Sequence, residues 1–505
     1  SGGYETLILW DSGRMDPDLT GNSAAEVAVL VSKLDELKSR PEVAGVVVDL
    51  ALQQHIQFLQ DQANTLASCP FASNLAARAI KGVVDDYRAT NPDLKYVVIV
   101  GGDAAIPFFR YPDQTLLGSE LGYDPPVADS TISQGSLRTN HILGQDEYGA
   151  EVLSLRDGEF PVPVLAVGRL VESAAEINRV LDAYLSTAEG IVDTPTSTLV
   201  TGYDFLEDTA NKIQEHLVAG TPGRNDSLIT AADVAPADPR SWTADQLRTE
   251  LLDEREDIIF LAGHFSANSA LAADYESILV TTELVASDVD LTNTLVYSAG
   301  CHSGYNIVDS HIVPGVTLYL DWPQAFAQKG ATLVAGTGYQ YGDTDFIEYS
   351  ERLYLEFTKQ LRTGPNFGGR GPVAIGEALV KAKQRYLAKT PDMRGLHRKS
   401  VIISTLFGLP MLRIDMPGER LVDSTDASNV LPTPIATGPG NKLGLLVADI
   451  NFDFTRPRPS GDGLLEPVAT TLTDVDSGGF LTATYLRGPD GVATNPAEPA
   501  LPLAT

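Results

Sequence analysis

Two residues with reactive side chains each end an apolar segment of the chain. The segment DIIFLAGH ends on His264, and the segment TLVYSAGC ends on Cys301, 37 residues later. A thiol becomes a nucleophile when a neighbouring acid or base can share its proton. This pair therefore suggests catalysis by a cysteine. The alternative is that both side chains pack in a core, because free cysteine is among the most frequently buried residue types.

Three glycines, Gly263, Gly300 and Gly304, lie close to the two reactive residues. They leave room for the backbone of a substrate to approach. In open parallel sheets, active sites form outside the carboxyl ends of the strands. If the two segments are neighbouring strands, we expect the imidazole and the thiol to face one another across this edge. On position alone, catalysis and core packing are equally well supported.

The elements that position these residues belong to a repeated pattern of strands and helices. Bounded apolar runs without alternation are typical of strands buried on both faces. Two pairs, Ser23 with Glu26 and Ser173 with Glu176, form capping boxes that predict helix starts. Strands that alternate with helices predict an α/β fold with parallel sheets. The predicted strands are residues 6–10, 44–50, 95–102, 163–169, 197–204, 257–264, 294–301 and 330–338.

The composition changes at about residue 416. Residues 416–441 are rich in Pro, Gly, Ser and Asp, which is typical of a linker. Beyond it, residues 442–454 and 480–488 resemble strands of a small β-rich tail. We therefore predict a third segment over residues 416–505, after two α/β subdomains at 1–190 and 191–415.

Charge and hydropathy limit the possible partners. The formal net charge is −31, with 67 acidic and 36 basic side chains. Such a surface repels phosphate backbones and argues against nucleic acid. No apolar run approaches the roughly 18 residues that span a bilayer, so no membrane span is expected. The N-terminus lacks the pattern of a signal peptide. The acidic surface suits a salty medium, so we expect an extracellular or cell-surface location.

The order of these segments resembles that of the gingipain-like cysteine peptidases, which share their fold with caspases and legumains. In that family, one apolar strand ends in His-Gly and a later one ends in Ala-Cys followed by Gly. Here LAGHFS and SAGCHSG stand at a comparable spacing. Three other segments are similar to family segments and keep the family's order over about residues 5–415: 96–107, 165–185 and 400–414.

The resemblance implies a fold and a mechanism. The fold is two caspase-like three-layer α/β/α subdomains with largely parallel sheets, the second of them catalytic, followed by the small β-rich segment. Cys301 would attack the scissile carbonyl of a polypeptide, and His264 would serve as acid and base. The backbone N–H groups of Cys301 and Phe265 are candidates for the oxyanion hole.

Two further positions can be compared with the family. Asp204 matches the family pattern, and Phe265 departs from it. An acidic residue after the preceding strand orients the histidine in the family, and Asp204 stands at the matching position. A solvated loop carboxylate is the equally supported alternative for Asp204. The family's glycine after the histidine is Phe265 here. If that position requires a positive φ, a phenylalanine costs about 1–2 kcal/mol.

A preference for a basic side chain before the scissile bond would require a carboxylate in the specificity pocket. Glu207 and Asp208 lie near the family's position for one, and Tyr341 is a candidate pocket wall. The favoured alternative is that Glu207 and Asp208 form an acidic pair at a helix N-terminus.

No cofactor is expected to be required. His302 and His311 lack the spacing of metal ligands, so no transition-metal site is predicted. Gingipain relatives often bind Ca²⁺, so the resemblance admits a structural calcium ion, for which acidic loops such as residues 341–345 are candidates. The two cysteines, Cys69 and Cys301, cannot form a disulfide framework.

Two other functions compete with a secreted cysteine endopeptidase. The first is a catalytically inactive gingipain-like surface or interaction protein, with Phe265 as a mark of lost activity. The second is a regulated caspase-like protease inside the cell, released by a partner or by cleavage. The sequence leaves the oligomeric state open.

Overall fold

The computed structural model describes residues 3–15, 22–155, 158–365, 369–390 and 392–431, together with six two-residue strands between 438 and 481. The chain divides into two compact units. The first comprises residues 1–151 and 161–426, and the second comprises residues 152–160 and 427–505. The catalytic candidates all lie in the first unit.

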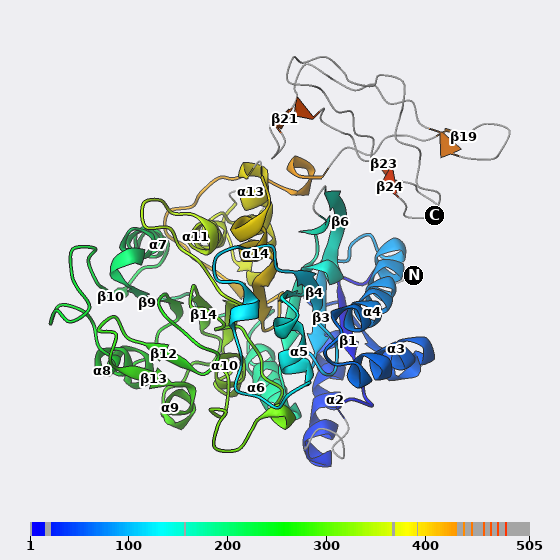
Figure 1. The fold of residues 1–505 in the computed structure, drawn as a ribbon, viewed down its shortest axis with the longest axis horizontal. Helices are drawn as coiled ribbons and strands as arrows, with labels where there is room; N and C mark the ends of the chain where they lie inside the picture. The colour runs from blue at the N-terminus through cyan, green and yellow to red at the C-terminus, as the bar shows by residue number, and fades with distance from the viewer. Residues whose placement is uncertain are drawn as a thin grey trace. The chain divides into compact units, whose positions relative to one another are not determined.

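One ten-stranded sheet runs through the first unit (Figure 1). Four of its strands are buried at every position, as the runs without alternation predict: β1 (Thr6–Trp10), β3 (Tyr96–Val100), β8 (Ala166–Leu170) and β15 (Thr332–Gly336). The edge strands β2 (Gly45–Asp49) and β10 (Arg224–Ile229) are partly exposed. In spatial order the strands are β10 (Arg224–Ile229), β9 (Ser197–Gly202), β11 (Ile258–Leu261), β14 (Leu295–Ser298), β15 (Thr332–Gly336), β17 (Ser404–Phe407), β8 (Ala166–Leu170), β3 (Tyr96–Val100), β1 (Thr6–Trp10) and β2 (Gly45–Asp49).

The sheet consists of two parallel halves that run in opposite directions. β17 is antiparallel to β15 and parallel to β8, which it meets through Phe407 and Arg169. The predicted boundary at residue 190 separates the strands of the two halves except for β17, which comes from the predicted second subdomain but runs parallel to β8 in the first half. Only β10, β9, β11, β14 and β15 direct their carboxyl ends toward the edge that carries Cys301.

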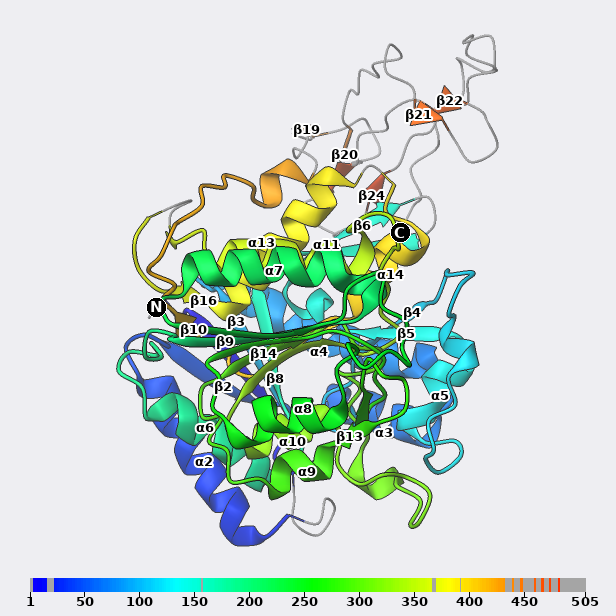
Figure 2. The same ribbon diagram turned by 90° about the vertical axis from the view of Figure 1, so that its left-hand side faces the viewer.

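Helices cover both faces of this sheet, which gives the predicted three layers (Figure 2). One face carries α7 (Glu207–Gly220), α11 (Tyr349–Leu361) and α13 (Ile375–Lys389). The other carries α2 (Ala24–Ser39), α6 (Ala174–Leu185), α8 (Ala244–Arg248), α9 (Thr281–Ala286) and α10 (Trp322–Gln328). The remaining helices of eight or more residues are α3 (Gln54–Thr65), α4 (Pro70–Thr90) and α14 (Gly395–Ile403). The mostly parallel α/β fold is therefore confirmed.

The helix starts follow from local chemistry. Ser23 and Ser173 cap α2 and α6 in complete capping boxes, as predicted. Residues 373–374 form the short strand β16, and α13 begins directly after it at Ile375. No helix among the described residues is long and apolar enough to cross a membrane.

The second unit contains short strand pairs. They are β19 (Gly438–Pro439) with β20 (Leu446–Val447), β21 (Arg458–Pro459) with β22 (Leu465–Glu466), and β23 (Leu472–Thr473) with β24 (Phe480–Leu481). The predicted strands at 442–454 and 480–488 contain β20 and β24, and their other residues lie outside the described part of the chain.

Candidate active site

Asp204, His264 and Cys301 follow three neighbouring parallel strands, β9, β11 and β14. In this sheet Phe260 pairs with Val200, and Leu261 pairs with Ser298. If the same register is continued past the last paired residues, His264 lies level with Asp204 on one side and with Cys301 on the other. The topology therefore brings the acid, the imidazole and the thiol to one edge of the sheet, in that order.

Cys301 is half-buried in a turn that Gln340 holds in place. The thiol donates to the backbone oxygen of Gln340 at 3.5 Å. The Gln340 side chain donates to the carbonyl oxygens of Ser298 and Gly300 at 2.8 and 2.7 Å. Burial raises the pKa of the Cys301 thiol above its ordinary value. The thiol is therefore neutral at rest and needs a base at the moment of attack.

His264 is exposed and lies among three aromatic rings. Its ring centroid is 5.2 Å from that of Tyr203, 5.4 Å from Phe205 and 5.3 Å from Tyr275. Partial burial lowers the pKa of His264, and the negative charge of Asp204 opposes this shift. Among the described residues, neither ring nitrogen has a hydrogen-bond partner. Asp204 therefore acts on the imidazole through its charge, while the aromatic rings restrict where the imidazole lies.

Phe265 has no strained backbone. Its φ is not among the positive values of the described non-glycine residues, so the penalty considered from the sequence does not arise. The positive φ of this segment, +153°, belongs to Gly263, where a Cβ would lie 2.4 Å from the Tyr203 ring. The Phe265 ring packs beside Trp322, at a centroid distance of 5.6 Å.

The Phe265 ring packs directly against the backbone of Gly300, the residue before Cys301. A Cβ at Gly300 would lie 2.3 Å from Cγ of Phe265. We expect Gly300→Ala to destabilise the fold by about 1–3 kcal/mol, because overpacking forces neighbouring groups to move. Chemical denaturation measures this change. The double variant Gly300→Ala, Phe265→Ala should lose less stability than the sum of the two single variants. Additive losses would show that the ring and the glycine are not coupled.

The proposed oxyanion donors are available. Among the described residues, the backbone N–H groups of Cys301 and Phe265 donate to no other residue, whereas the flanking His302 and Ser266 N–H groups donate to Gly338 and Ser269 at 2.9 Å. Unpaired N–H groups beside a nucleophile can bind the oxygen that becomes negative during attack on a carbonyl.

A buried charged network supports the turn behind the thiol. Nε2 of His302, the residue after Cys301, donates to Oε2 of Glu120 at 2.8 Å. Lys399 Nζ lies 2.7 Å from Oε1 of Glu120 and 2.8 Å from Oδ2 of Asp113. The Tyr339 N–H also donates to Glu120 at 2.8 Å. All four charged or ionisable side chains are at most 1% exposed. The network thus holds His302 and Tyr339, which are the chain neighbours of Cys301 and Gln340.

The residues suggested for substrate binding lie on segments that touch. The Tyr341 hydroxyl donates to the Leu117 carbonyl at 3.0 Å. A Cβ at Gly342, the next residue, would lie 2.8 Å from the Leu206 side chain. Glu207 accepts a hydrogen bond from the Ala232 N–H, and Asp208 is exposed at the start of α7. The acid pair therefore does occupy a helix N-terminus, beside the strand end that carries Asp204.

Sequence reasoning missed Gln340 and the Glu120 network. Gln340 had a detectable signal, because it follows β15, the next parallel strand beyond β14, and polar residues at such ends are candidates for a site. Glu120 and Lys399 had none: each lies in a segment distant in sequence from Cys301, and only the tertiary fold brings them together.

A three-layer, mostly parallel α/β fold with these groups at one strand edge defines a protein with a caspase-like fold. The crystal structure of the Arg-specific cysteine proteinase gingipain R (RgpB) is similar to this chain, with a TM-score of 0.50 and 15% identity over 98% of this chain and 91% of that one. The complex of the Porphyromonas gingivalis RgpB pro- and mature domains gives a TM-score of 0.48 and 15% identity over 97% and 92%. The sequence matches no protein-family model and gives no significant match to a curated protein. The resemblance to gingipains is thus confirmed at the level of the fold.

Proposed function

We propose that this protein is a cysteine endopeptidase that cleaves polypeptides through Cys301. The observation that supports the proposal is the register of β9, β11 and β14, because Asp204, His264 and Cys301 follow the carboxyl ends of three strands that pair side by side. The unpaired N–H groups of Cys301 and Phe265 support it, because acyl transfer needs donors for the developing oxyanion.

The chemistry follows from the neutral resting thiol. His264 accepts the thiol proton as Cys301 Sγ forms a bond to the scissile carbonyl carbon. The N–H groups of Cys301 and Phe265 stabilise the oxyanion. The C–N bond then breaks, and His264 returns the proton to the leaving amine. In the second half, His264 takes a proton from water, which attacks the thioester and releases the acid and the thiol.

Asp204 is proposed to tune the imidazole by charge. Because Asp204 raises the pKa of His264, Asp204→Asn should lower it. A base must be unprotonated, so the acidic limb of kcat/KM is expected below pH 6.5 and should move to lower pH in the variant. The pH–rate profile measures this shift. The matched variant Asp208→Asn should leave the limb in place. An unmoved limb in Asp204→Asn would contradict the role.

We propose that the carboxylates of Asp208 and Glu207 select a basic side chain before the scissile bond. Tyr341 would form a wall of this specificity pocket. Asp208 is the more available of the two acids, because it is exposed whereas Glu207 is half-buried. A panel of fluorogenic peptides ending in Arg, Lys or Asp tests the activity and the preference together. Turnover that a thiol-alkylating reagent abolishes would support a cysteine peptidase. No turnover of any peptide would favour the non-catalytic interaction protein.

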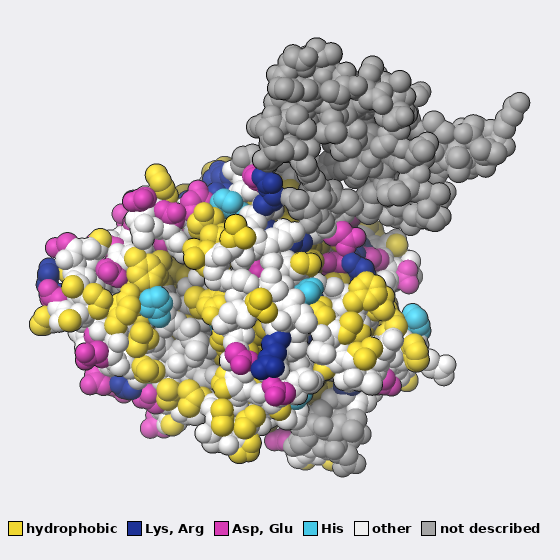
Figure 3. Space-filling view, in the orientation of Figure 1, with side chains coloured by type: hydrophobic (Ala, Val, Ile, Leu, Met, Phe, Trp, Pro, Cys, Tyr) yellow, Lys and Arg dark blue, Asp and Glu magenta, His cyan; other side chains and the backbone are white. Residues whose placement is uncertain are grey.

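We place this activity outside the cell, on the cell surface or in the surrounding medium. The support is the net charge of −31, because salt screens the repulsion between the acidic side chains. Acidic side chains line the left-hand edge of the face in Figure 3.

A further inference from the structure

Three leucines in one short loop are largely exposed to solvent. Leu116, Leu117 and Leu121 follow strand β4 (Phe109–Pro112) and are 105%, 68% and 63% exposed. Leu116 is the most exposed large apolar side chain among the described residues. Single apolar residues are common on protein surfaces, whereas a group of them marks a site of interaction. The peptidase proposal uses none of these leucines, and we call residues 113–123 the leucine loop.

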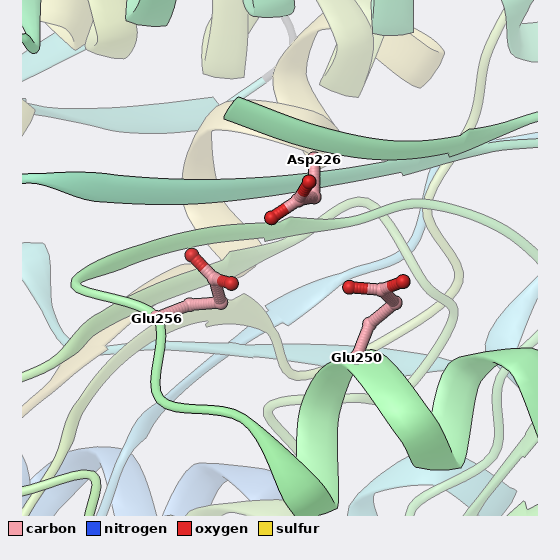
Figure 4. Close-up of side chains that lie close together, drawn as sticks. All are labelled: Asp226, Glu250 and Glu256. Carbon is pink, nitrogen blue, oxygen red and sulfur yellow. The ribbon is translucent and has the colours of Figure 1, made fainter. Parts of the chain in front are cut away.

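A cluster of acidic side chains outside the candidate site is balanced by the chain itself. The carboxylates of Asp226, Glu250 and Glu256 approach one another, with one oxygen of each within 4.8 Å of the others (Figure 4). Arg224 pairs with Asp226 and with Glu256. These acids therefore have a counter-ion within the protein, whereas the described residues leave the three leucines uncovered.

Buried contacts hold the base of the leucine loop. Asp113 accepts hydrogen bonds from the N–H and the hydroxyl of Thr115, at 3.0 and 2.7 Å, and from the N–H of Glu120 at 2.9 Å. Lys399 Nζ donates to the Gly118 carbonyl at 3.0 Å. Satisfied buried polar groups of this kind rigidify the chain. The loop is therefore held in a conformation that directs its leucines outward.

The leucine loop lies beside the segment that contacts the thiol. The Tyr341 hydroxyl donates to the Leu117 carbonyl at 3.0 Å, and a Cβ at Gly118 would lie 2.5 Å from that hydroxyl. Gln340, the residue before Tyr341, accepts the hydrogen bond of the Cys301 thiol. One tyrosine side chain thus connects the loop to the nucleophile's own neighbour.

The chemistry of the proposed reaction decides which part of a substrate meets the leucine loop. His264 returns a proton to the leaving amine, so the residues after the scissile bond depart on the side of β11. The residues before the bond stay attached to Cys301 as the thioester and lie on the other side of β14, toward β15 and Tyr341. An extended chain rises about 3.3 Å per residue, so a side chain two to four residues before the bond reaches the loop.

We propose that Leu116, Leu117 and Leu121 bind an apolar side chain of the substrate, two to four residues before the scissile bond. This inference rests on the proposed function and specifies its substrate class, which is polypeptides with a residue such as leucine or phenylalanine at that place. Contact between this side chain and the leucines removes apolar surface of both from water, and this removal is the favourable step.

The test compares two fluorogenic peptides on the full chain. Both carry the preferred residue directly before the scissile bond, and they differ only in having leucine or serine two, three or four places before it. At one of these places, kcat/KM for the leucine peptide should be about tenfold higher, the gain typical of burying one apolar side chain. Ratios near one at all of these places would overturn the proposal.

Substitutions of leucine locate the contact. The double variant Leu116→Ala, Leu117→Ala should bring the ratio to within about twofold of one. If that variant fails to fold, Leu121→Ala replaces it and should lower the ratio. The matched control is Leu52→Ala, because Leu52 is 78% exposed but lies in η1 (Leu50–Leu52), after the edge strand β2. It should keep the tenfold ratio. An unchanged ratio in the loop variants, or an equal loss in the control, would overturn the proposal.

Binding separates this inference from the peptidase proposal. Fluorescence anisotropy of the labelled peptides on Cys301→Ala gives Kd values without turnover. A Kd about tenfold lower for the leucine peptide, lost when Leu116→Ala and Leu117→Ala are added, would support the apolar surface even if the wild-type protein cleaves neither peptide. Equal cleavage of both peptides would overturn the apolar surface and leave the peptidase proposal standing. Neither turnover nor a binding preference would overturn both.

Discussion

Replacing Cys301 with alanine is expected to lower kcat/KM for peptide hydrolysis by at least about 10³-fold. The thiol supplies the atom that forms the bond to the scissile carbonyl, and no other described side chain at this strand edge can replace it as a nucleophile of comparable strength. The residual rate would come from binding and from the oxyanion donors alone. Steady-state kinetics with the best peptide of the panel measures the loss.

The second cysteine provides a matched control. Cys69 is also free and half-buried, but it stands at the N-terminus of helix α4 and not at the strand edge that carries Cys301. Cys69→Ala should therefore leave kcat/KM within about twofold of the wild-type value. A denaturation curve for Cys301→Ala should show that the fold remains intact, because the substitution removes one sulfur atom from a half-buried position. Equal turnover by the wild-type protein and Cys301→Ala would assign the activity to a contaminant and leave the interaction protein as the better interpretation.

The sequence predicts the edge of the sheet on which the candidate site lies, because apolar runs locate the buried strands and His264 and Cys301 stand at their carboxyl ends. It does not predict the register. The spacing of 37 residues would be the same for any pairing of β11 with β14, and only the pairing of Leu261 with Ser298 shows that the two strands end side by side. The antiparallel strand β17 was also not predictable, since a short buried strand has the same composition in either direction.

The environment of each candidate depends on contacts that the sequence pattern does not contain. An orienting carboxylate for His264 was expected at Asp204, but aromatic rings surround the imidazole and Asp204 acts by charge. Phe265 would cost backbone energy if its position required a positive φ. Instead the positive φ lies at Gly263, and the Phe265 ring packs on Gly300. Both outcomes are set by which side chains meet across neighbouring strand ends, which local periodicity cannot specify.

Lys399→Met is expected to cost about 3–5 kcal/mol of unfolding free energy at pH 7, because removing one partner of a buried ion pair leaves an uncompensated charge. Lys399 is 1% exposed and contacts two carboxylates, Asp113 and Glu120, that are both 0% exposed. Urea denaturation measures the loss. Lys212→Met removes an exposed lysine whose ion pair is with Glu215, and it should cost less than about 1 kcal/mol.

The pH dependence of this loss identifies the charged partner. Burial alone would raise the pKa of Glu120, but the hydrogen bond from His302 and the charge of Lys399 lower it below its ordinary value of 4.5. A carboxylate with a lowered pKa stabilises the fold above pH 4.5, and this contribution is lost as pH falls through the lowered pKa. In Lys399→Met the pKa of Glu120 should rise, so the native state takes up a proton more readily. The difference in stability between the two proteins should therefore be largest near pH 7 and shrink below pH 4.5. A difference that stays constant from pH 7 to pH 4 would show that lost packing, and not the buried charge, accounts for the effect.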